Sequence, residues 1–199
     1  GTVFREEIAG PLGADFHIGL PASEDARVAD LKPPADGSIS ADPTMTEIKK
    51  ITLTNPGVDV SETRTRAWRG AEIPAAGGTG NARAVAMIHT ILANGGAAGG
   101  KQYLSEAGCR KALEQQIEGT DLILGIPVRY GLGFGLSGPM SPALNEHSMF
   151  WGGYGGSIAL IDMQAHTTVS YAMNRMEGTT TGDMRAISLA MQAMPGLTA

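Results

Sequence analysis

The sequence predicts an α+β fold, in which helices pack against an antiparallel sheet. Two apolar segments, 157–163 and 167–174, are rich in residues that favour strands, and only three residues separate them. Such a short connection joins antiparallel strands. Apolar residues at helical spacing precede this pair at 79–94 and follow it at 182–194. Helices that flank a pair of antiparallel strands are typical of the α+β class.

Length and composition indicate one globular unit. The chain has 199 residues, of which 42% are hydrophobic, and this is enough to bury a core. We expect residues 1–199 to form a portion of one domain, without internal repeats. The net charge is −5 and no basic stripe is present, which argues against nucleic acid as a partner. No apolar run approaches the ~18 residues of a membrane span, so none is expected.

A single cysteine, Cys109, limits the redox and metal chemistry of the chain. It cannot close an internal disulfide, and no second thiol or histidine stands near it at metal-ligand spacing. We therefore expect no metal and no cofactor. The cysteine usage favours a reducing compartment such as the cytoplasm, while a chain that starts with Gly1 leaves export open.

The first third of the chain is predicted to be largely irregular. A short helix through Phe4 and Ile8 should stop at Gly10 and Pro11, because proline cannot continue the helical hydrogen bonds. Polar, proline-punctuated sequence follows, and we expect residues 21–66 to form an irregular surface excursion. Such a segment is either a linker or an ordered loop near a site.

Two helices are predicted in the middle of the chain. The first follows Asn81, a favoured N-cap residue, and ends before Gly95, a favoured stop. The second covers residues 101–116, where the apolar pattern is looser. Short strands are expected at 122–124 and over the alternating apolar positions of 130–136.

The C-terminal quarter carries the clearest pattern. Residues 157–163 and 167–174 are expected to pair through a hairpin turn at 164–166. A terminal helix over 182–194 then ends at a Pro-Gly pair. This helix is able to lie on the strand pair, which completes the α+β architecture.

The residues of the chain do not form a complete catalytic apparatus. A serine nucleophile with a lysine base needs Ser-x-x-Lys, and none of the eleven serines has a lysine three residues later. The nearest pattern, Ser61 followed by Arg64, lacks a base because arginine stays protonated. The four histidines share no metal-ligand spacing, and His89 inside a predicted helix favours a structural role.

A glycine-rich motif at residues 150–156 has the composition of a backbone that binds an anion. Its sequence is FWGGYGG, and it lies directly before the apolar strand. Glycines let a ligand approach the main chain and leave N–H groups available, which is how an oxyanion is held during acyl transfer. The alternative is a bulge or bend that opens the strand. Composition alone leaves both interpretations open.

The motif resembles one wall of the active site in the serine β-lactamase and penicillin-binding-protein fold, in particular in the β-lactamase-like carboxylesterases. Lactamases of that family have Lys-Thr-Gly at this strand edge and esterases often have Trp-Gly-Gly, which Trp151, Gly152 and Gly153 match. Segments 4–13 and 73–83 are similar to a Pro-Leu-Gly turn and to a site-bordering helix of the family, in the same order. The resemblance covers the whole chain and implies a serine hydrolase that forms an acyl-enzyme.

The resemblance also implies roles for individual residues. The backbone N–H of Tyr154 is implied to be an oxyanion donor, and Gly153 to belong to the catalytic wall. Phe150, Trp151 and Gly152 are implied to bind the substrate. The rings of Phe150, Trp151 and Tyr154 are implied to form an apolar wall for acyl or aryl groups. Because Trp151 stands where lactamases have lysine, neutral esters are favoured over anionic β-lactams.

The first two motifs of the family, Ser-x-x-Lys and Tyr-x-Asn, do not occur in this chain and would lie before Gly1. The chain is therefore expected to be the C-terminal portion of a longer carboxylesterase-like hydrolase and to be inactive alone. Its expected partners are a small-molecule ester and either the N-terminal portion with the nucleophile or another copy of this chain. A non-catalytic binding protein, and a β-lactamase or D-alanyl peptidase, are the alternatives.

Overall fold

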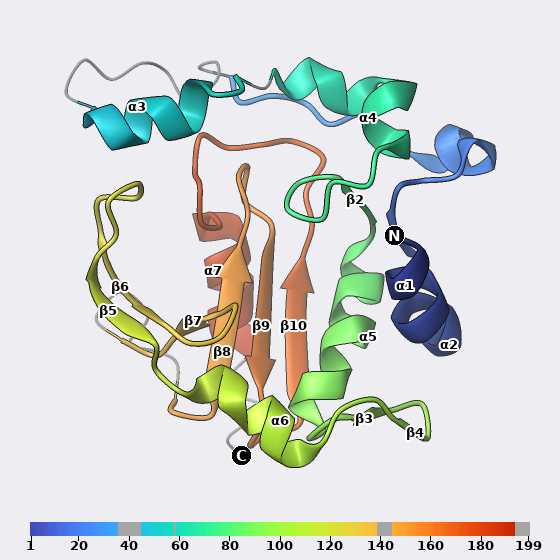
Figure 1. Cartoon of the computed structure of the whole chain (residues 1–199), viewed down its shortest axis with the longest axis vertical. Helices are drawn as coiled ribbons and strands as arrows, with labels where there is room; N and C mark the ends of the chain where they lie inside the picture. Colours follow the sequence, from blue (N-terminus) through green and yellow to red (C-terminus); the bar gives the residue numbers. More distant parts are fainter. Residues whose placement is uncertain (36–44, 58, 139–144, 194–199) are drawn as a thin grey trace.

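An antiparallel sheet forms the centre of the computed structural model, which describes residues 1–35, 45–57, 59–138 and 145–193 (Figure 1). Six strands of the described residues pair in the order β10-β9-β8-β7-β6-β5. Their bounds are Ile117–Thr120 (β5), Pro127–Tyr130 (β6), Gly135–Leu136 (β7), Ser148–Gly152 (β8), Ile158–Asp162 (β9) and Thr167–Tyr171 (β10). Each strand is antiparallel to its neighbours.

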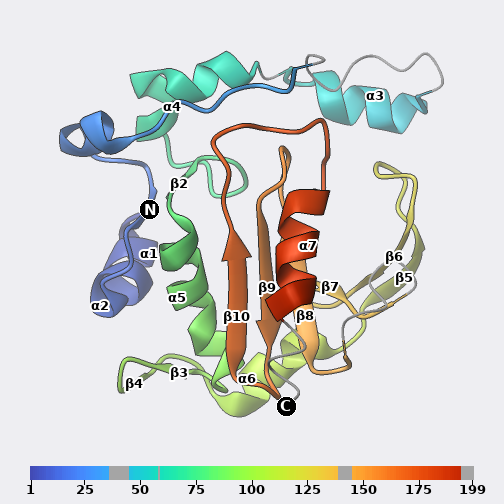
Figure 2. The same cartoon turned by 180° about the vertical axis from the view of Figure 1, so that it is seen from behind.

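Helices cover both faces of this sheet. On one face, α5 (Ala82–Ala93) lies along β9 and β10, and α6 (Glu106–Arg110) leads into a 3-10 turn, Lys111–Leu113, against β8. On the other face lies α7 (Met184–Ala193), which Figure 2 shows from its own side. The predicted α+β architecture is confirmed.

The core lies between the sheet and the α5 side. Met149 on β8 and Ile161 on β9 stand directly opposite each other and are completely buried. Because side chains alternate along a strand, both point to the same face as α5 and α6. The buried members of this cluster are Ala93, Cys109, Ala112, Leu136, Met149, Ile161 and Met163. Burial of each large apolar side chain contributes about 1.5–3 kcal/mol.

The helix predicted after Asn81 is confirmed as α5. The Asn81 side chain accepts a hydrogen bond of 2.9 Å from Ala84 N–H, which satisfies a free donor of the first turn. The helix ends where Gly95 and Gly96 adopt positive φ angles of 64° and 102°. The end of α5 is also tied to the sheet, because His166 Nδ1 lies 3.1 Å from the carbonyl oxygen of Ala93.

The predicted C-terminal hairpin and helix are confirmed. β9 and β10 pair antiparallel through a turn at residues 163–166. The terminal helix begins at Met184, two residues later than predicted, because Asp183 is its cap. Residue 194, the predicted last residue of that helix, lies outside the described residues.

The predicted stop of the first helix at Gly10 and Pro11 is wrong. Short α-helical turns, Thr2–Phe4 (α1) and Gly10–Leu12 (α2), are continuous with a π-helical turn, Arg5–Ala9, between them. The wider π turn ends with a bond from Gly10 N–H to Arg5 O, so proline enters without the usual clash. The helical segment stops at Gly13, where φ is 66°.

The predicted helix over 101–116 is also wrong in its extent. Lys101–Gln102 (β4) pairs with Ala97–Ala98 (β3), and only then does α6 begin. Ser105 caps α6 by accepting a 3.0 Å hydrogen bond from Gly108 N–H. This serine is the start signal that the looser apolar pattern concealed.

The predicted strand at 122–124 is a turn, and the strand over 130–136 is interrupted. The Asp121 carboxylate accepts hydrogen bonds of 2.8 Å from the N–H groups of Ile123 and Leu124, which is an Asx turn. Between β6 and β7, Gly131 and Gly133 form a tight connection, and Gly133 has a φ of 81°. The alternating apolar residues of 130–136 therefore extend over the end of β6, the turn after it and β7.

The described part of segment 21–66 lies mostly at the surface but contains short helices. These are the 3-10 helices Ala22–Arg27 and Val60–Arg64, and α3 (Glu47–Thr54), which buries no residue; α4 (Arg66–Gly70) follows directly. The expectation of irregular structure is therefore corrected for the described part of this segment; residues 36–44 and 58 lie outside it. A ribbon of Phe16–Ile18 (β1) and Gly78–Gly80 (β2) connects it to α5. No helix in the described ranges has the length and apolar character that a bilayer crossing requires.

Candidate functional site

Residues 153–157 form a connection between β8 and β9, here called the glycine loop. The last ladder pair before it joins Gly152 to Ile158. Figure 1 places this connection at the same end of the sheet as α3 and α4. The predicted glycine-rich motif thus occupies the end of β8 and the loop that follows.

The main chain of the glycine loop is bonded on several sides. Gly153 N–H donates to Ser157 O at 2.8 Å, and Gly155 N–H donates to Thr179 O at 2.8 Å. Gly156 N–H donates to Gly153 O at 3.2 Å. Tyr154 N–H has no hydrogen-bond acceptor among the described residues, so this donor stands available in a loop whose neighbours are held.

Two glycines of the motif leave no room for a side chain. An ideal Cβ on Gly152 would overlap the main chain of Thr181 and lie 2.6 Å from the Gly182 nitrogen. At Gly156, where φ is 119°, a Cβ would overlap the Asp183 carboxylate. Close approach of segment 179–183 therefore explains why these positions are glycine.

Asp183 and Arg185 hold the glycine loop from the α7 side. The Asp183 side chain is 3% exposed and is hydrogen-bonded to the Arg185 guanidinium. That hydrogen bond lowers the pKa of Asp183 against the opposing effect of burial. Arg185 also donates to Gly155 O at 3.4 Å and to Arg175 O at 3.1 Å. The pair connects the cap of α7 to the loop that carries Tyr154.

We expect Arg185→Met to loosen the glycine loop. The variant loses the donors to Gly155 O and to Asp183, so amide hydrogen exchange of residues 153–157 should rise about tenfold. Exchange measured by mass spectrometry checks this. Arg110→Met is the matched control, because among the described residues Arg110 pairs only with Glu106 on its own helix. Equal exchange in both variants would contradict the role assigned to Arg185.

The aromatic residues of the motif do not share one wall. Trp151 lies on the α5 face and is 47% exposed, and its ring stands 5.6 Å from the ring of Tyr130. Phe150 points to the opposite face, where an ideal Cβ on Gly135 would lie 2.8 Å from its ring. The expected common wall is corrected, because neighbouring residues of a strand face opposite sides. The Tyr154 hydroxyl is buried and makes no hydrogen bond within the described chain.

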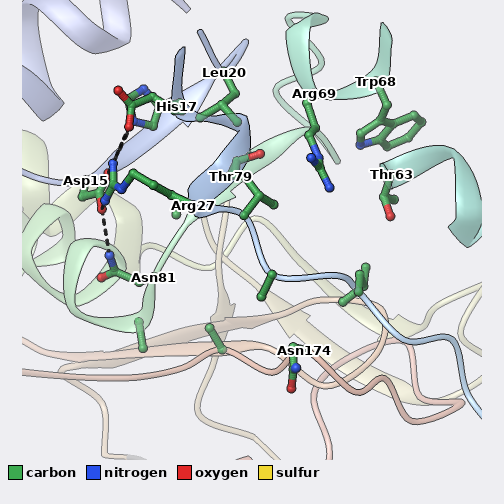
Figure 3. A pocket seen from close by; sticks show the side chains of 18 of the residues that line it. Asp15, His17, Leu20, Arg27, Thr63, Trp68, Arg69, Thr79, Asn81 and Asn174 are labelled. Atoms are coloured by element: carbon green, nitrogen blue, oxygen red, sulfur yellow. Dashed lines mark hydrogen bonds and ion pairs between the residues drawn. The ribbon is translucent and has the colours of Figure 1, made fainter. Parts of the chain in front are cut away.

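A cavity of about 620 Å³ lies beside the glycine loop, and none of the predicted site residues lines it. Its walls come from the β1–β2 ribbon, from the segment through α4, and from residues 172–174 after β10 (Figure 3). Met173 connects the two places, because it lines the cavity and its Cε would lie 2.6 Å from a Cβ on Gly155.

Sequence reasoning missed the polar network of this cavity. The Asp15 carboxylate binds the Arg27 guanidinium at 2.5 Å and accepts from Asn81 Nδ2 at 3.3 Å (Figure 3). The bond from Arg27 lowers the pKa of Asp15. His17 Nε2 lies 3.4 Å from the same carboxylate. The available signal was the two-residue spacing of Asp15, directly before β1, and His17 on β1.

Comparison with known proteins gives this geometry a family. A family model described as Beta-lactamase matches residues 1–193. The chain belongs to the beta-lactamase family. Within this family the chain has the beta-lactamase and transpeptidase-like fold, as the resemblance of residues 150–156 implied.

Individual relatives of this beta-lactamase-family chain include esterases. "Esterase/beta-lactamase LipL" from Mycobacterium tuberculosis is 30% identical over 191 residues. The solved structure of a family VIII carboxylesterase is 33% identical, with a TM-score of 0.86 over 99% of this chain. A penicillin-binding protein homolog from Caulobacter crescentus is also 33% identical, with a TM-score of 0.84 over 98% of this chain.

The chain spans about half the length of these relatives. It covers 42% of the LipL protein, to which 87% of this chain aligns, and it covers 51% and 52% of the two solved chains. The described residues include no cluster of His, Cys, Asp and Glu that could hold a metal ion. The beta-lactamase family and the fold of the chain are established by the family match and the two solved relatives.

Proposed function

We propose that this chain supplies the oxyanion-binding wall of a serine carboxylesterase, and that an N-terminal portion supplies the nucleophile. The observation that carries the proposal is the available N–H of Tyr154 in a loop whose neighbouring amides are bonded. The family and the carboxylesterase among its relatives support this assignment.

The chemistry follows from the position of that donor. When a serine oxygen attacks an ester carbonyl carbon, the carbonyl oxygen gains negative charge. A backbone N–H that already points at this oxygen stabilises the charge without reorganisation, and removal of one such donor costs about 10²–10³ in kcat. The glycines beside Tyr154 let the acyl group approach the main chain. In this role Gly153 and Tyr154 act through their backbone.

Trp151 favours neutral substrates in this proposal. Its half-exposed ring beside Tyr130 offers apolar surface and one N–H donor. A lysine at this place would attract a substrate carboxylate instead. We therefore propose short neutral esters as the substrate class, and penicillins and cephalosporins as poor substrates. Phe150 contributes by packing behind the strand and not by touching the substrate.

The decisive experiment compares the intact parent polypeptide with the 199-residue chain. The parent should hydrolyse p-nitrophenyl esters, and a phosphonate ester should label one serine of its N-terminal portion. The 199-residue chain alone should show no turnover above background. Labelling of a serine within residues 1–199, or a parent that hydrolyses penicillin faster than every ester tested, would contradict the proposal.

In the parent, Trp151→Lys should lower ester kcat/KM and raise the relative affinity for penicillins. The added cation replaces apolar surface with a partner for the β-lactam carboxylate, so a change of about tenfold in the ratio of the two is expected. Steady-state kinetics on both substrate classes measure this ratio.

Tyr154→Phe is the control for that experiment. It keeps the backbone N–H and removes a buried hydroxyl that has no hydrogen-bond partner in the described chain. Ester turnover should therefore change little, and stability should stay equal or rise slightly. Loss of turnover in folded Tyr154→Phe protein would show that the hydroxyl acts and not the backbone.

A further inference from the structure

Arg69 points into the cavity beside the glycine loop (Figure 3), and its side chain has no hydrogen-bond acceptor within the part of the chain that the structure describes. Its side chain is 13% exposed, and its Nε is buried without a partner among the described residues. The nearest carboxylate oxygens, on Asp25 and Asp30, lie 3.8 and 3.9 Å from its terminal nitrogens. These distances are too long for hydrogen bonds. A guanidinium carries five N–H donors, and leaving the buried Nε–H without an acceptor costs free energy.

The surroundings of Arg69 indicate which kind of acceptor is missing. Asp25 and Asp30 lie within 4 Å of Arg69, and Asp25 also pairs with Arg66 at 2.7 Å, so two carboxylates balance two guanidinium groups and a further anion gains little. A neutral carbonyl oxygen satisfies the donors without adding charge. The rest of the lining mixes apolar side chains such as Trp68 and Leu31 with polar ones such as Asn174. Such a lining suits a stretch of polypeptide, which presents carbonyl oxygens along its main chain.

The outer edge of β10, next to the cavity, is a second surface without a partner in the described residues. β10 is the last strand at its end of the sheet, and within the described residues nothing pairs with its outer edge. The strand has no lysine or proline, which commonly protect exposed edges. Ser170 on this strand has a buried hydroxyl without a partner in the described residues. Residues 172–174, which line the cavity, follow directly.

The lengths of the relatives indicate which polypeptide segment occupies the cavity. This chain superimposes on nearly its full length with the two solved relatives of 33% identity, yet accounts for only 51% and 52% of them. A polypeptide of similar length therefore belongs to each relative and needs a surface to pack on.

We propose that the cavity seats a segment of the N-terminal portion of the same polypeptide, and that Arg69 donates hydrogen bonds to main-chain carbonyl oxygens of that segment. The inference shares with the proposed function the existence of an N-terminal portion. It concerns assembly and not hydrolysis, so the two are tested separately.

The experiment uses the intact parent with a protease site introduced directly before Gly1. The folded protein is cleaved there, and the dissociation rate of the two portions is measured by surface plasmon resonance. Arg69→Met should raise this rate about 10- to 100-fold, because carbonyl oxygens then lose a charged donor. Arg69→Lys, which keeps a cation but fewer donors, should give an intermediate rate. Arg110→Met, an exposed arginine on α6, should match the unchanged protein.

The melting temperature of each intact variant, measured before cleavage, separates misfolding from weaker assembly. If Arg69→Met cannot be purified folded, the comparison of Arg69→Lys with Arg110→Met decides the question in the same way. Equal dissociation rates for the Arg69 variants and the control would overturn the inference. So would symmetrical dimers of the 199-residue chain that Arg69→Met disrupts, because the occupant would then be a second copy. A cleaved complex that depends on Arg69 but hydrolyses no ester would leave the inference standing and reject the proposed function.

Discussion

Replacement of Gly152 by alanine is expected to lower the free energy of unfolding by about 3 kcal/mol and to abolish ester turnover in the parent. The added Cβ would overlap the main chain of Thr181 and reach 2.6 Å from the Gly182 nitrogen. Main-chain atoms cannot rotate away as a side chain can, so β8 and segment 179–183 must separate. That separation moves the glycine loop, because Gly155 N–H in this loop donates a hydrogen bond to Thr179 O in segment 179–183.

Thermal unfolding and ester kinetics measure the effect of Gly152→Ala. A loss of about 3 kcal/mol corresponds to roughly 6–12 °C for a chain of this size. Gly57→Ala is the matched control, because its nearest contact would be Thr54 O at an ordinary 3.7 Å. A Gly152→Ala protein with unchanged melting temperature and turnover would disprove the close packing of segment 179–183 on β8.

Asp162→Ala should cost about 3–5 kcal/mol at neutral pH, which is the largest effect we expect from one side chain outside the glycine loop. Its carboxylate is 3% exposed and accepts from Ser148 Oγ at 3.0 Å and from Asn145 Nδ2 at 2.8 Å. It also accepts from the N–H groups of Gln164 and Ala165 in the hairpin turn. Alanine leaves Asn145 Nδ2 and the two turn N–H groups without this acceptor in a buried place, whereas Ser148 Oγ can still donate to Asn145 Oδ1 at 3.0 Å.

The effect of Asp162→Ala should depend on pH in a defined direction. Burial alone would raise the pKa of Asp162, but the hydrogen bonds to its carboxylate outweigh burial and hold the pKa below its ordinary value. A lowered pKa in the folded state means that this stabilisation is present above the pKa of the unfolded chain, about 3.9. It is lost as pH falls through the lower pKa of the folded state.

Urea unfolding at neutral pH and near pH 3 checks this prediction. The difference between the unchanged protein and Asp162→Ala should shrink at the lower pH. Asp162→Asn is the control, since it keeps the shape of the side chain but cannot ionise, and its stability should vary less with pH than that of the unchanged protein. A difference between the unchanged protein and Asp162→Ala that is equal at both pH values would contradict the role of the charge.

Local sequence patterns correctly predicted the elements that are stabilised by residues close to one another in the sequence. The helix α5 combines an N-cap at Asn81, helical apolar spacing and a glycine stop, and all three signals agree. The β9–β10 hairpin likewise depends on two apolar strands with a short turn. These elements were predicted with bounds close to those observed.

The predictions for the helix over 101–116 and the strand at 122–124 failed because in each case one polar side chain determines the main-chain conformation. Ser105 caps α6, which begins five residues later than the apolar pattern suggested, and Asp121 folds the segment after it into a turn. Apolar spacing alone does not reveal such bonds. The π-helical turn before Pro11 was missed for another reason, because the composition of a segment does not determine the register of its main-chain hydrogen bonds.

The candidate site was predictable only in part for a similar reason. The family motif located Trp151 and the glycines, but the alternation of β8 separates Phe150 from Trp151. The cavity with Arg69 and Asp15 joins segments that are tens of residues apart in the chain, and their contact arises only from the packed fold. No local signal could bring them together.

Under the proposed function, the alternation of β8 makes strand register a determinant of substrate choice. A slip of one residue against β9 would turn Trp151 toward the α7 face and Phe150 toward the α5 face. Gly135 provides room for the ring of Phe150, and an indole in that place would meet a smaller space. Insertions or deletions in the β8–β9 connection should therefore alter ester selectivity even when every residue of β8 is kept. Changes in the length of this connection and in the residues of the two strands are thus coupled.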